Sequence, residues 1–113
     1  MPNCIRFSQY KIMWTLVLFD LPTETKKQRK AASDFRKALI SDGFSMFQFS
    51  IYTRHSPSRE NSDVHVERTI RSLPDEGRVC ILRLTDKQFA DIKVFDKGTR
   101  TEPPTESFQL ELF

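Results

Sequence analysis

The stretch TLVLFDLP, residues 15–22, decides how the rest of the chain is interpreted. It continues an apolar run from residue 13, and both alternating sets of side chains are apolar, as in a strand that is covered on both faces. Pro22 ends the strand because proline cannot donate to a sheet ladder. The run closes on Asp20, whose ionised carboxylate is unfavourable in an apolar core. We therefore predict a buried strand over residues 13–20 with an unexplained acid at its end.

Length and composition limit the class of protein. A chain of 113 residues is enough for one domain, and 38% hydrophobic with 29% charged residues is typical of a globular protein. No apolar run approaches the roughly 20 residues that cross a bilayer, so we expect no membrane partner. The first residues lack the apolar core of a signal peptide, and Cys4 and Cys80 are too few for a disulfide framework. These features predict a reduced, cytoplasmic protein.

A helix is predicted over residues 26–41. Thr25 and Gln28 have the spacing of a capping box, in which each side chain satisfies a free backbone amide of the first turn. Gly43 provides a left-handed stop after the last turn. The inward stripe recurs at helical spacing: Ala31, Ala32, Phe35 and Leu39.

The segment after this helix is predicted to be extended. Residues 43–54 form either one long strand or two short strands joined by a bend, with Phe47, Phe49 and Ile51 on one face. The remaining elements follow from turn signals and periodicity: a polar loop at residues 55–63, a second helix at 63–73, a turn at 74–77, a strand at 78–85, a short helical turn after Thr85, and a strand at 107–113. The second helix would bury Val66, Ile70 and Leu73.

The order of these elements places both long helices on one face of a small sheet, because right-handed crossovers put them on the same side. The other face then has no cover within one chain, although the first strand is apolar on both faces. A second copy of the same sheet is the simplest cover, so we expect a homodimer.

Basic residues cluster at the start of the first predicted helix. The net charge is only +3, and a solvated basic surface explains it equally well. Clustering favours nucleic acid instead, since Arg36 and Lys37 continue the basic run along the same helix. The candidates for nucleic-acid binding are Lys26, Lys27, Arg29, Lys30, Arg54 and Arg59.

The order of these features resembles the CRISPR-associated protein 2 family. Its members share a first strand that ends in Asp, a basic helix that closes on Gly, and a strand with the pattern Gln-x-Ser-Ile/Val-aromatic. This chain matches with TLVLFDLP, the basic cluster, Gly43 and the run FQFSIY at residues 47–52. We therefore divide the chain into an N-terminal extension (1–12, with Met13 as a candidate natural start), a domain (13–96), a linker (97–106) and a C-terminal edge strand (107–113).

The resemblance implies a ferredoxin-like α+β fold, βαββαβ with an additional C-terminal strand, and a homodimer in which the two sheets face each other. It implies a role in CRISPR spacer acquisition, where the dimer bridges CRISPR integrase subunits and holds double-stranded DNA. Family members are also described as metal-dependent endonucleases that cleave RNA or DNA. By the same resemblance Asp20 is the expected catalytic residue and the ligand of Mg²⁺ at the dimer seam.

The residues alone leave two roles open for Asp20. It could cap the turn over residues 21–25, which is common for an Asp before a helix. Alternatively, two copies that meet at a twofold axis would bring two carboxylates together and attract a divalent cation. The resemblance favours the second role. Gln48 and Ser50 are expected on the strand face opposite Phe47 and Phe49, where they are either candidates for residues near that site or ordinary polar edge residues. Four further titratable residues are expected at the surface without a role: Asp34, Asp42, His55 and His65.

Three functions follow as hypotheses. A dimeric scaffold would bind double-stranded DNA through backbone contacts that ignore sequence. A nuclease would need Asp20 and a divalent ion, with RNA (single-stranded RNA included) or DNA as substrate. An RNA-binding ferredoxin-like domain is disfavoured, because Phe47 and Phe49 are expected to point toward the core with no basic–aromatic stacking signature beside them. One acid per subunit is little for catalysis, so the scaffold is the favoured function.

Overall fold

The computed structural model describes residues 12–97. Within this range the elements in chain order are β1 (Met13–Asp20), α2 (Lys26–Ser41), β2 (Ser45–Gln48), β3 (Ile51–Ser56), α3 (Arg59–Arg71), β4 (Arg78–Thr85) and α4 (Asp86–Ala90). The predicted C-terminal strand lies outside the described residues, as do the N-terminal extension and the linker except for Ile12 and Lys97.

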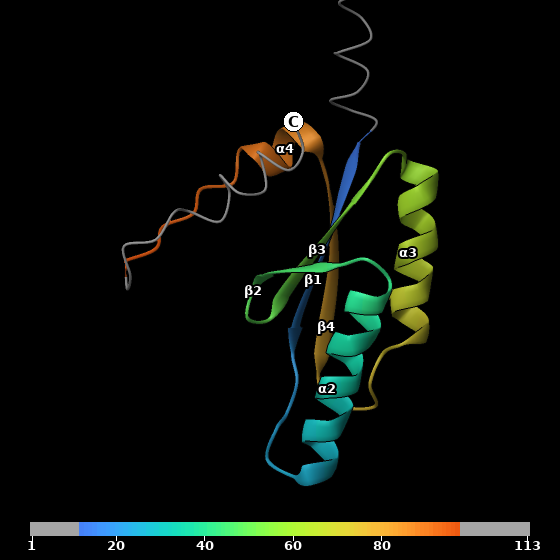
Figure 1. The fold of residues 1–113 in the computed structure, drawn as a ribbon, viewed down its shortest axis with the longest axis vertical. Helices are drawn as coiled ribbons and strands as arrows, with labels where there is room; N and C mark the ends of the chain where they lie inside the picture. The colour runs from blue at the N-terminus through green and yellow to red at the C-terminus, as the bar shows by residue number, and fades with distance from the viewer. Residues whose placement is uncertain (1–11, 98–113) are drawn as a thin grey trace, which may run out of the picture.

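The four strands form one antiparallel sheet in the order β2-β3-β1-β4. β1 is central and pairs with β4 along its whole length, from Met13 to Asp20. Figure 1 shows α2 and α3 together on one side of the sheet and α4 on the other side. The predicted ferredoxin-like α+β architecture is therefore confirmed for the single chain. None of the helices in residues 12–97 is both long enough and apolar enough to cross a membrane.

α2 forms where the sequence predicts it. Thr25 Oγ1 accepts a hydrogen bond from the Gln28 amide at 3.1 Å, and Gln28 Oε1 accepts one from the Thr25 amide at 3.0 Å, which completes the capping box. Gly43 follows the helix with φ at +93°, and a Cβ there would lie 2.0 Å from Nη1 of Arg54. The inner face of α2 and the sheet form the main apolar core: Val17, Phe19, Phe35, Leu39, Phe44 and Tyr52.

The extended region after α2 is two strands, β2 and β3, joined by a turn at residues 49–50. The pairing register shifts between Met46 and Gln48, so the hairpin contains an irregularity. Phe47 and Ile51 both pack against a second apolar cluster, formed by Trp14, Leu16 and Phe89, so they point to one side as predicted. The prediction for Phe49 is wrong, because the turn takes it out of the strand alternation and exposes its side chain.

α3 begins earlier than predicted. Ser58 Oγ accepts a hydrogen bond from the Asn61 amide at 3.0 Å, so the helix starts at Arg59 rather than near Asp63. His55 and Ser56 belong to β3. The predicted loop at residues 55–63 is therefore reduced to a connection of two residues, Pro57 and Ser58.

The buried face of α3 also differs from the prediction. Ser62, His65 and Thr69 are buried, whereas Ile70 and Leu73 are exposed. The buried stripe is thus rotated by one residue, about 100° around the helix. It is stable because its polar groups are hydrogen-bonded: Ser62 Oγ donates to the Arg59 carbonyl at 2.8 Å, and Thr69 Oγ1 donates to the His65 carbonyl at 2.9 Å.

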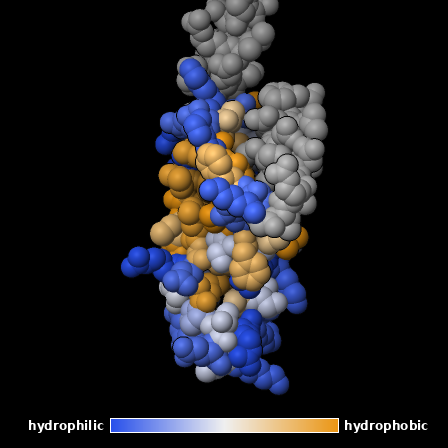
Figure 2. Space-filling view, turned by 90° about the vertical axis from the view of Figure 1, so that its left-hand side faces the viewer, coloured by the Kyte–Doolittle hydropathy of each residue, from blue (hydrophilic) through white to orange (hydrophobic). Residues whose placement is uncertain are grey.

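The sheet face opposite α2 and α3 is partly covered by α4. Phe89 stacks on Trp14 with ring centroids 3.9 Å apart, and Trp14 Nε1 donates to Asp86 Oδ1 at 2.8 Å. This cover was not anticipated from the sequence, and it leaves part of the face apolar, with Cys80 and Leu82 exposed and Leu18 and Ile51 half-buried. We call that part the open face and define it by Leu18, Ile51, Cys80 and Leu82. Figure 2 shows this side of the molecule as an apolar band between hydrophilic ends.

Candidate nucleic-acid interface

Asp20 is the exposed last residue of β1. Strand alternation places its side chain on the same side of the sheet as Leu18, at the end of the open face. Its carboxylate forms no ion pair and no hydrogen bond within residues 12–97. The turn before α2 is capped by Thr25 instead. Asp20 is therefore not a local cap, and its charge is available to another group.

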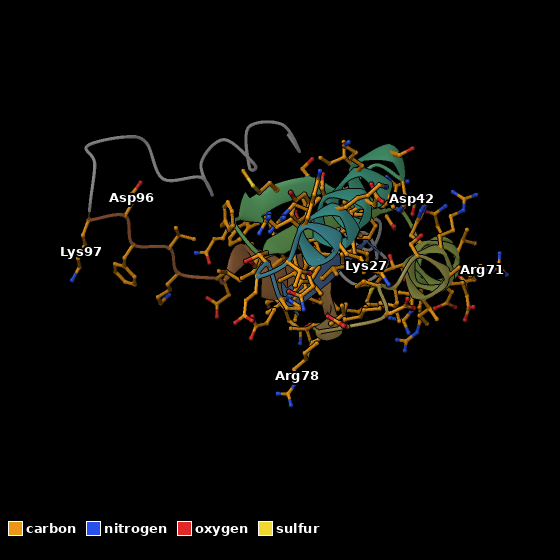
Figure 3. All side chains as sticks on the ribbon, turned by 90° about the horizontal axis from the view of Figure 1, so that it is seen from below. Lys27, Asp42, Arg71, Arg78, Asp96 and Lys97 are labelled. Atoms are coloured by element: carbon orange, nitrogen blue, oxygen red, sulfur yellow. The ribbon has the colours of Figure 1, made fainter. Side chains whose placement is uncertain are left out.

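The end of β1 is held closely by the start of β4. Arg78 is the register partner of Asp20, but Figure 3 shows its side chain extending away from the body of the protein. Gly77 has φ at +98°, and a Cβ there would lie 2.9 Å from the Asp20 carbonyl oxygen. Only glycine therefore allows β4 to begin so close to the acid.

A single chain does not provide a magnesium site at Asp20. Within residues 12–97 no group of three or more His, Cys, Asp or Glu side chains is arranged to hold a metal ion. Mg²⁺ requires octahedral oxygen ligands, and a lone carboxylate would have to leave most of them to water and phosphate. The donor set fits a divalent cation only if a second copy contributes its own Asp20.

Ser50 lies beside the end of β1, whereas Gln48 is one strand further away, on β2. The Phe19 amide donates to the Ser50 carbonyl at 3.0 Å, so the β2–β3 turn is fixed beside the residue that precedes Asp20. Gln48 is exposed at the end of β2. Neither side chain forms a hydrogen bond with the Asp20 carboxylate in the described part of the chain.

The first turns of α2 carry several exposed basic side chains. Arg29 Nη1 donates to the carbonyls of Thr23 and Glu24, each at 3.1 Å, and this fixes the guanidinium beside the loop that leaves β1. Lys30 pairs with the exposed Asp34 at 2.9 Å. Lys26 and Lys27 form no ion pair within residues 12–97. We call the group Lys26, Lys27, Arg29 and Lys30 the α2 basic cluster; all four side chains are exposed.

Arg54 and Arg59 do not join the α2 basic cluster. The guanidinium of Arg54 lies over Gly43, at the opposite end of a helix about 24 Å long. Its Nε is buried and has no hydrogen-bond partner among the residues that the structure describes. Arg59 is exposed at the start of α3. The structure therefore places the two predicted groups of basic residues in different regions.

Asp42 and His65 are not the free surface residues that the sequence suggested. Asp42 Oδ2 lies 2.9 Å from Nδ1 of the buried His65, and Oδ1 accepts a hydrogen bond from Arg68 at 2.9 Å. Burial raises the pKa of Asp42, but the hydrogen bonds from His65 and Arg68 outweigh burial and hold the pKa below its ordinary 3.8. The contact joins the end of α2 to the middle of α3. No spacing rule could have found it, because the partners are 23 residues apart.

His55 is exposed, as predicted, with its ring 5.4 Å from that of Trp14.

Comparison with known proteins identifies relatives of this chain. A family model described as CRISPR associated protein Cas2 matches residues 13–92. A protein of Flavobacterium psychrophilum named CRISPR-associated endoribonuclease Cas2 is 54% identical over 110 residues, covering 96% of this chain and 94% of that protein. A protein of the same name from Parvibaculum lavamentivorans is 50% identical over 102 residues, covering 89% of this chain and 100% of that protein.

A solved structure supports the fold independently. It is described as a crystal structure of cas2 and superposes with a TM-score of 0.55, covering 80% of this chain and 94% of that one. The sequence identity is 18%, so this similarity concerns the fold alone.

Proposed function

The chain belongs to the CRISPR associated protein Cas2 family, and on that premise we propose that it acts as a dimeric scaffold in CRISPR spacer acquisition. In this role two copies pair through their open faces, bridge integrase subunits and hold double-stranded DNA by its backbone. The observation that carries the proposal is the exposed α2 basic cluster on a chain whose open face is available to a second copy.

The α2 basic cluster suits backbone recognition. Lysine and arginine side chains neutralise phosphates and release counterions, and this gives an affinity that depends on salt and not on sequence. Lys26 and Lys27 are not engaged by carboxylates in the described residues, so binding phosphate would cost them no internal ion pair. Arg29 is already oriented by two carbonyls. The cluster is therefore suited to a duplex of any sequence.

The open face suits association with a second copy. Leu82 and Leu18 are apolar side chains on adjacent strands, and none of the helices in residues 12–97 buries them fully. A twofold axis through this face would cover both sheets with the same surface. The Asp20 carboxylates, which end β1 in each copy, would then approach the seam between the two sheets.

A metal-dependent nuclease is the second candidate function, since the relatives are named endoribonucleases and Asp20 has no partner among the described residues. Asp20 of each copy would hold the ion, and a divalent cation there would polarise a bound phosphate. This candidate requires the dimer, because one chain supplies one carboxylate. We rank it below the scaffold for that reason.

Matched double substitutions test the scaffold proposal. Lys26→Glu with Lys27→Glu reverses two charges in the α2 basic cluster, and Lys93→Glu with Lys97→Glu makes the same change in net charge on the segment that runs away from the sheet (Figure 3). Binding of a short blunt DNA duplex is measured by fluorescence anisotropy at several salt concentrations. We expect the first variant to lose about a hundredfold in affinity and about 2 in the salt slope. Equal losses of duplex affinity in both variants would show that the α2 basic cluster is not the DNA-binding site.

A further inference from the structure

Phe49 is an exposed aromatic ring held by a cation. It lies in the β2–β3 turn with 75% of its surface exposed. Cζ of Arg36, from α2, lies 5.1 Å from the centroid of the Phe49 ring and 5.5 Å from that of Phe19. The guanidinium therefore contacts one buried ring and one exposed ring.

Arg36 is fixed but not neutralised. Phe19, beneath it, is buried and meets Phe35 edge to face with centroids 5.4 Å apart. Within residues 12–97 Arg36 forms no ion pair, and no hydrogen bond uses its guanidinium donors. Its donors are thus free to bind an anion while its plane stays in place.

The Arg36–Phe49 pair lies beside the end of β1. The hydrogen bond from the Phe19 amide to the Ser50 carbonyl, 3.0 Å long, joins the residue before Asp20 to the residue after Phe49. The turn that carries Phe49 is therefore held at the same end of the sheet as Asp20, although Arg36 lies over Phe19 on the α2 side and the Asp20 side chain lies on the side of the open face.

We propose that Arg36 and Phe49 form a clamp for one nucleotide of single-stranded nucleic acid, with an unstacked base on the Phe49 ring and a phosphate on the Arg36 guanidinium. The proposal rests on the proposed function in that it takes nucleic acid as the ligand. Stacking on an aromatic ring tolerates every base, and guanidinium donors match phosphate oxygens. A base inside a duplex is already stacked, so the clamp selects single strands or frayed ends. The expectation that disfavoured RNA binding, with Phe49 in the core and no basic residue beside it, does not hold.

A second copy is the other occupant that an exposed phenylalanine could have. Covering Phe49 with protein would also desolvate the guanidinium of Arg36, which forms no ion pair in the described part of the chain, and this is unfavourable without a partner carboxylate. Nucleic acid supplies the base and the anion together, so it fits both halves of the clamp.

Binding of single strands tests the clamp. Short single-stranded RNA and DNA and a blunt duplex are titrated by anisotropy, in chelator, against the full chain and two variants. Phe49→Leu keeps an apolar side chain but removes the ring; Phe95→Leu removes the ring of a phenylalanine that is 78% exposed on the distal segment. We expect Phe49→Leu to lose about tenfold or more for both single strands and nothing for the duplex, with Phe95→Leu unchanged. An RNA-only or DNA-only loss identifies the strand that the clamp prefers and still supports it.

Tryptophan fluorescence gives an independent readout. Trp14 is the single tryptophan of the chain and is buried, so Phe49→Trp adds an exposed reporter over a measurable background. We expect a single strand to quench the Phe49→Trp variant and to leave the unsubstituted protein unchanged. Sedimentation of each variant checks the association state.

Two results would overturn the clamp: single-strand affinity unchanged by Phe49→Leu, or a loss that accompanies a change in association state. The proposed function is judged separately from the Lys26 and Lys27 charge reversal. If the charge reversal abolishes duplex binding and Phe49→Leu has no effect on single strands, the clamp is rejected and the scaffold is kept. If the charge reversal leaves duplex binding intact and Phe49→Leu weakens single-strand binding, the clamp is kept and the scaffold is rejected.

Discussion

The two faces of the sheet carry similar apolar side chains but have different cover. On the face under α2, Val17 and Phe19 of β1 pack against Phe35 and Leu39 and are buried. On the open face, Leu82 of β4 remains 48% exposed although its register partner Leu16 is buried. β1 contributes to both faces, so the difference lies in what covers them. Apolar residues under α2 serve folding, and those on the open face are available for association.

The covered face is itself divided. Its α2 half is an apolar core, whereas its α3 half buries Ser62, His65 and Thr69. Arg83 of β4 reaches across this half to Ser62 at 3.2 Å and also pairs with Asp63. The hydroxyls of Thr15 and Ser56 are buried there without a hydrogen-bond partner in residues 12–97. Stability should therefore come mainly from the α2 half.

The largest effect is expected from Phe35→Ala in the apolar half of the covered face. The side chain is almost fully buried, and its removal leaves a cavity, so unfolding should lose about 3–5 kcal/mol. Urea unfolding measures this. Phe95→Ala, at an exposed position, is the control and should change stability by less than about 0.5 kcal/mol. Similar losses at both positions would contradict the location of the core.

Leu82→Glu should separate association from folding. A carboxylate in a buried apolar interface is strongly unfavourable, so the dimer dissociation constant should rise about a hundredfold or more while the monomer stays folded. Ile70→Glu is the matched control, because Ile70 is 46% exposed against 48% for Leu82 but lies on α3. Light scattering at micromolar concentration measures both. A dimer that survives Leu82→Glu, or an unsubstituted protein that is monomeric, would show that the open face is not the interface.

The polar half of the covered face should depend on pH through Asp42. Because the folded pKa is below the ordinary 3.8, the stabilisation is fully present above that value and is lost as pH falls through the folded pKa. Asp42→Asn should cost about 1–3 kcal/mol at neutral pH and flatten the acid limb of the stability curve. Urea unfolding between about pH 7 and pH 3 compares it with Asp34→Asn, whose carboxylate is exposed. If the free energy of unfolding of Asp42→Asn falls with decreasing pH as steeply as that of the unsubstituted protein, Asp42 is not the source of the pH dependence.

The smallest stability effect is expected on the α2 basic cluster. Lys30 and Asp34 form a fully exposed ion pair that solvent screens, so Lys30→Ala should leave the free energy of unfolding almost unchanged. The same substitution should also weaken the salt dependence of duplex binding. The plot of the logarithm of affinity against the logarithm of salt concentration should become less steep by about 1. A stability loss larger than the loss in binding would assign Lys30 to folding rather than to DNA.

The sequence predicted β1, α2, β4 and the capping turn of α4 because each depends on local signals. The Thr25–Gln28 and Thr85–Gln88 boxes and the left-handed Gly43 are determined within a few residues. The prediction of the buried face of α3 was wrong because the packing of this helix depends on distant partners. His65 is bound by Asp42 and Ser62 by Arg83, and these contacts outweigh the burial of Ile70.

The candidate site was predicted only in part for the same reason. Asp20 and the α2 basic cluster were recognisable because they stand next to elements with strong signals. The Arg36–Phe49 pair was missed because periodicity continued a strand through Phe49, where the chain in fact turns. The two possibilities for residues 43–54 differ in which face each side chain meets, and long-range pairing with β1 decides between them.

Spacer acquisition in cells by Asp20→Asn tests the central claim, that this chain is a scaffold first and a nuclease second. The variant keeps the shape of the side chain and removes its charge. If the scaffold dominates, acquisition should stay near that of the unsubstituted protein, while reversal of the α2 basic cluster abolishes it; any metal-dependent cleavage should still fall by about a hundredfold. An Asp20→Asn protein that is folded, dimeric and able to bind DNA, yet loses acquisition, would contradict the claim.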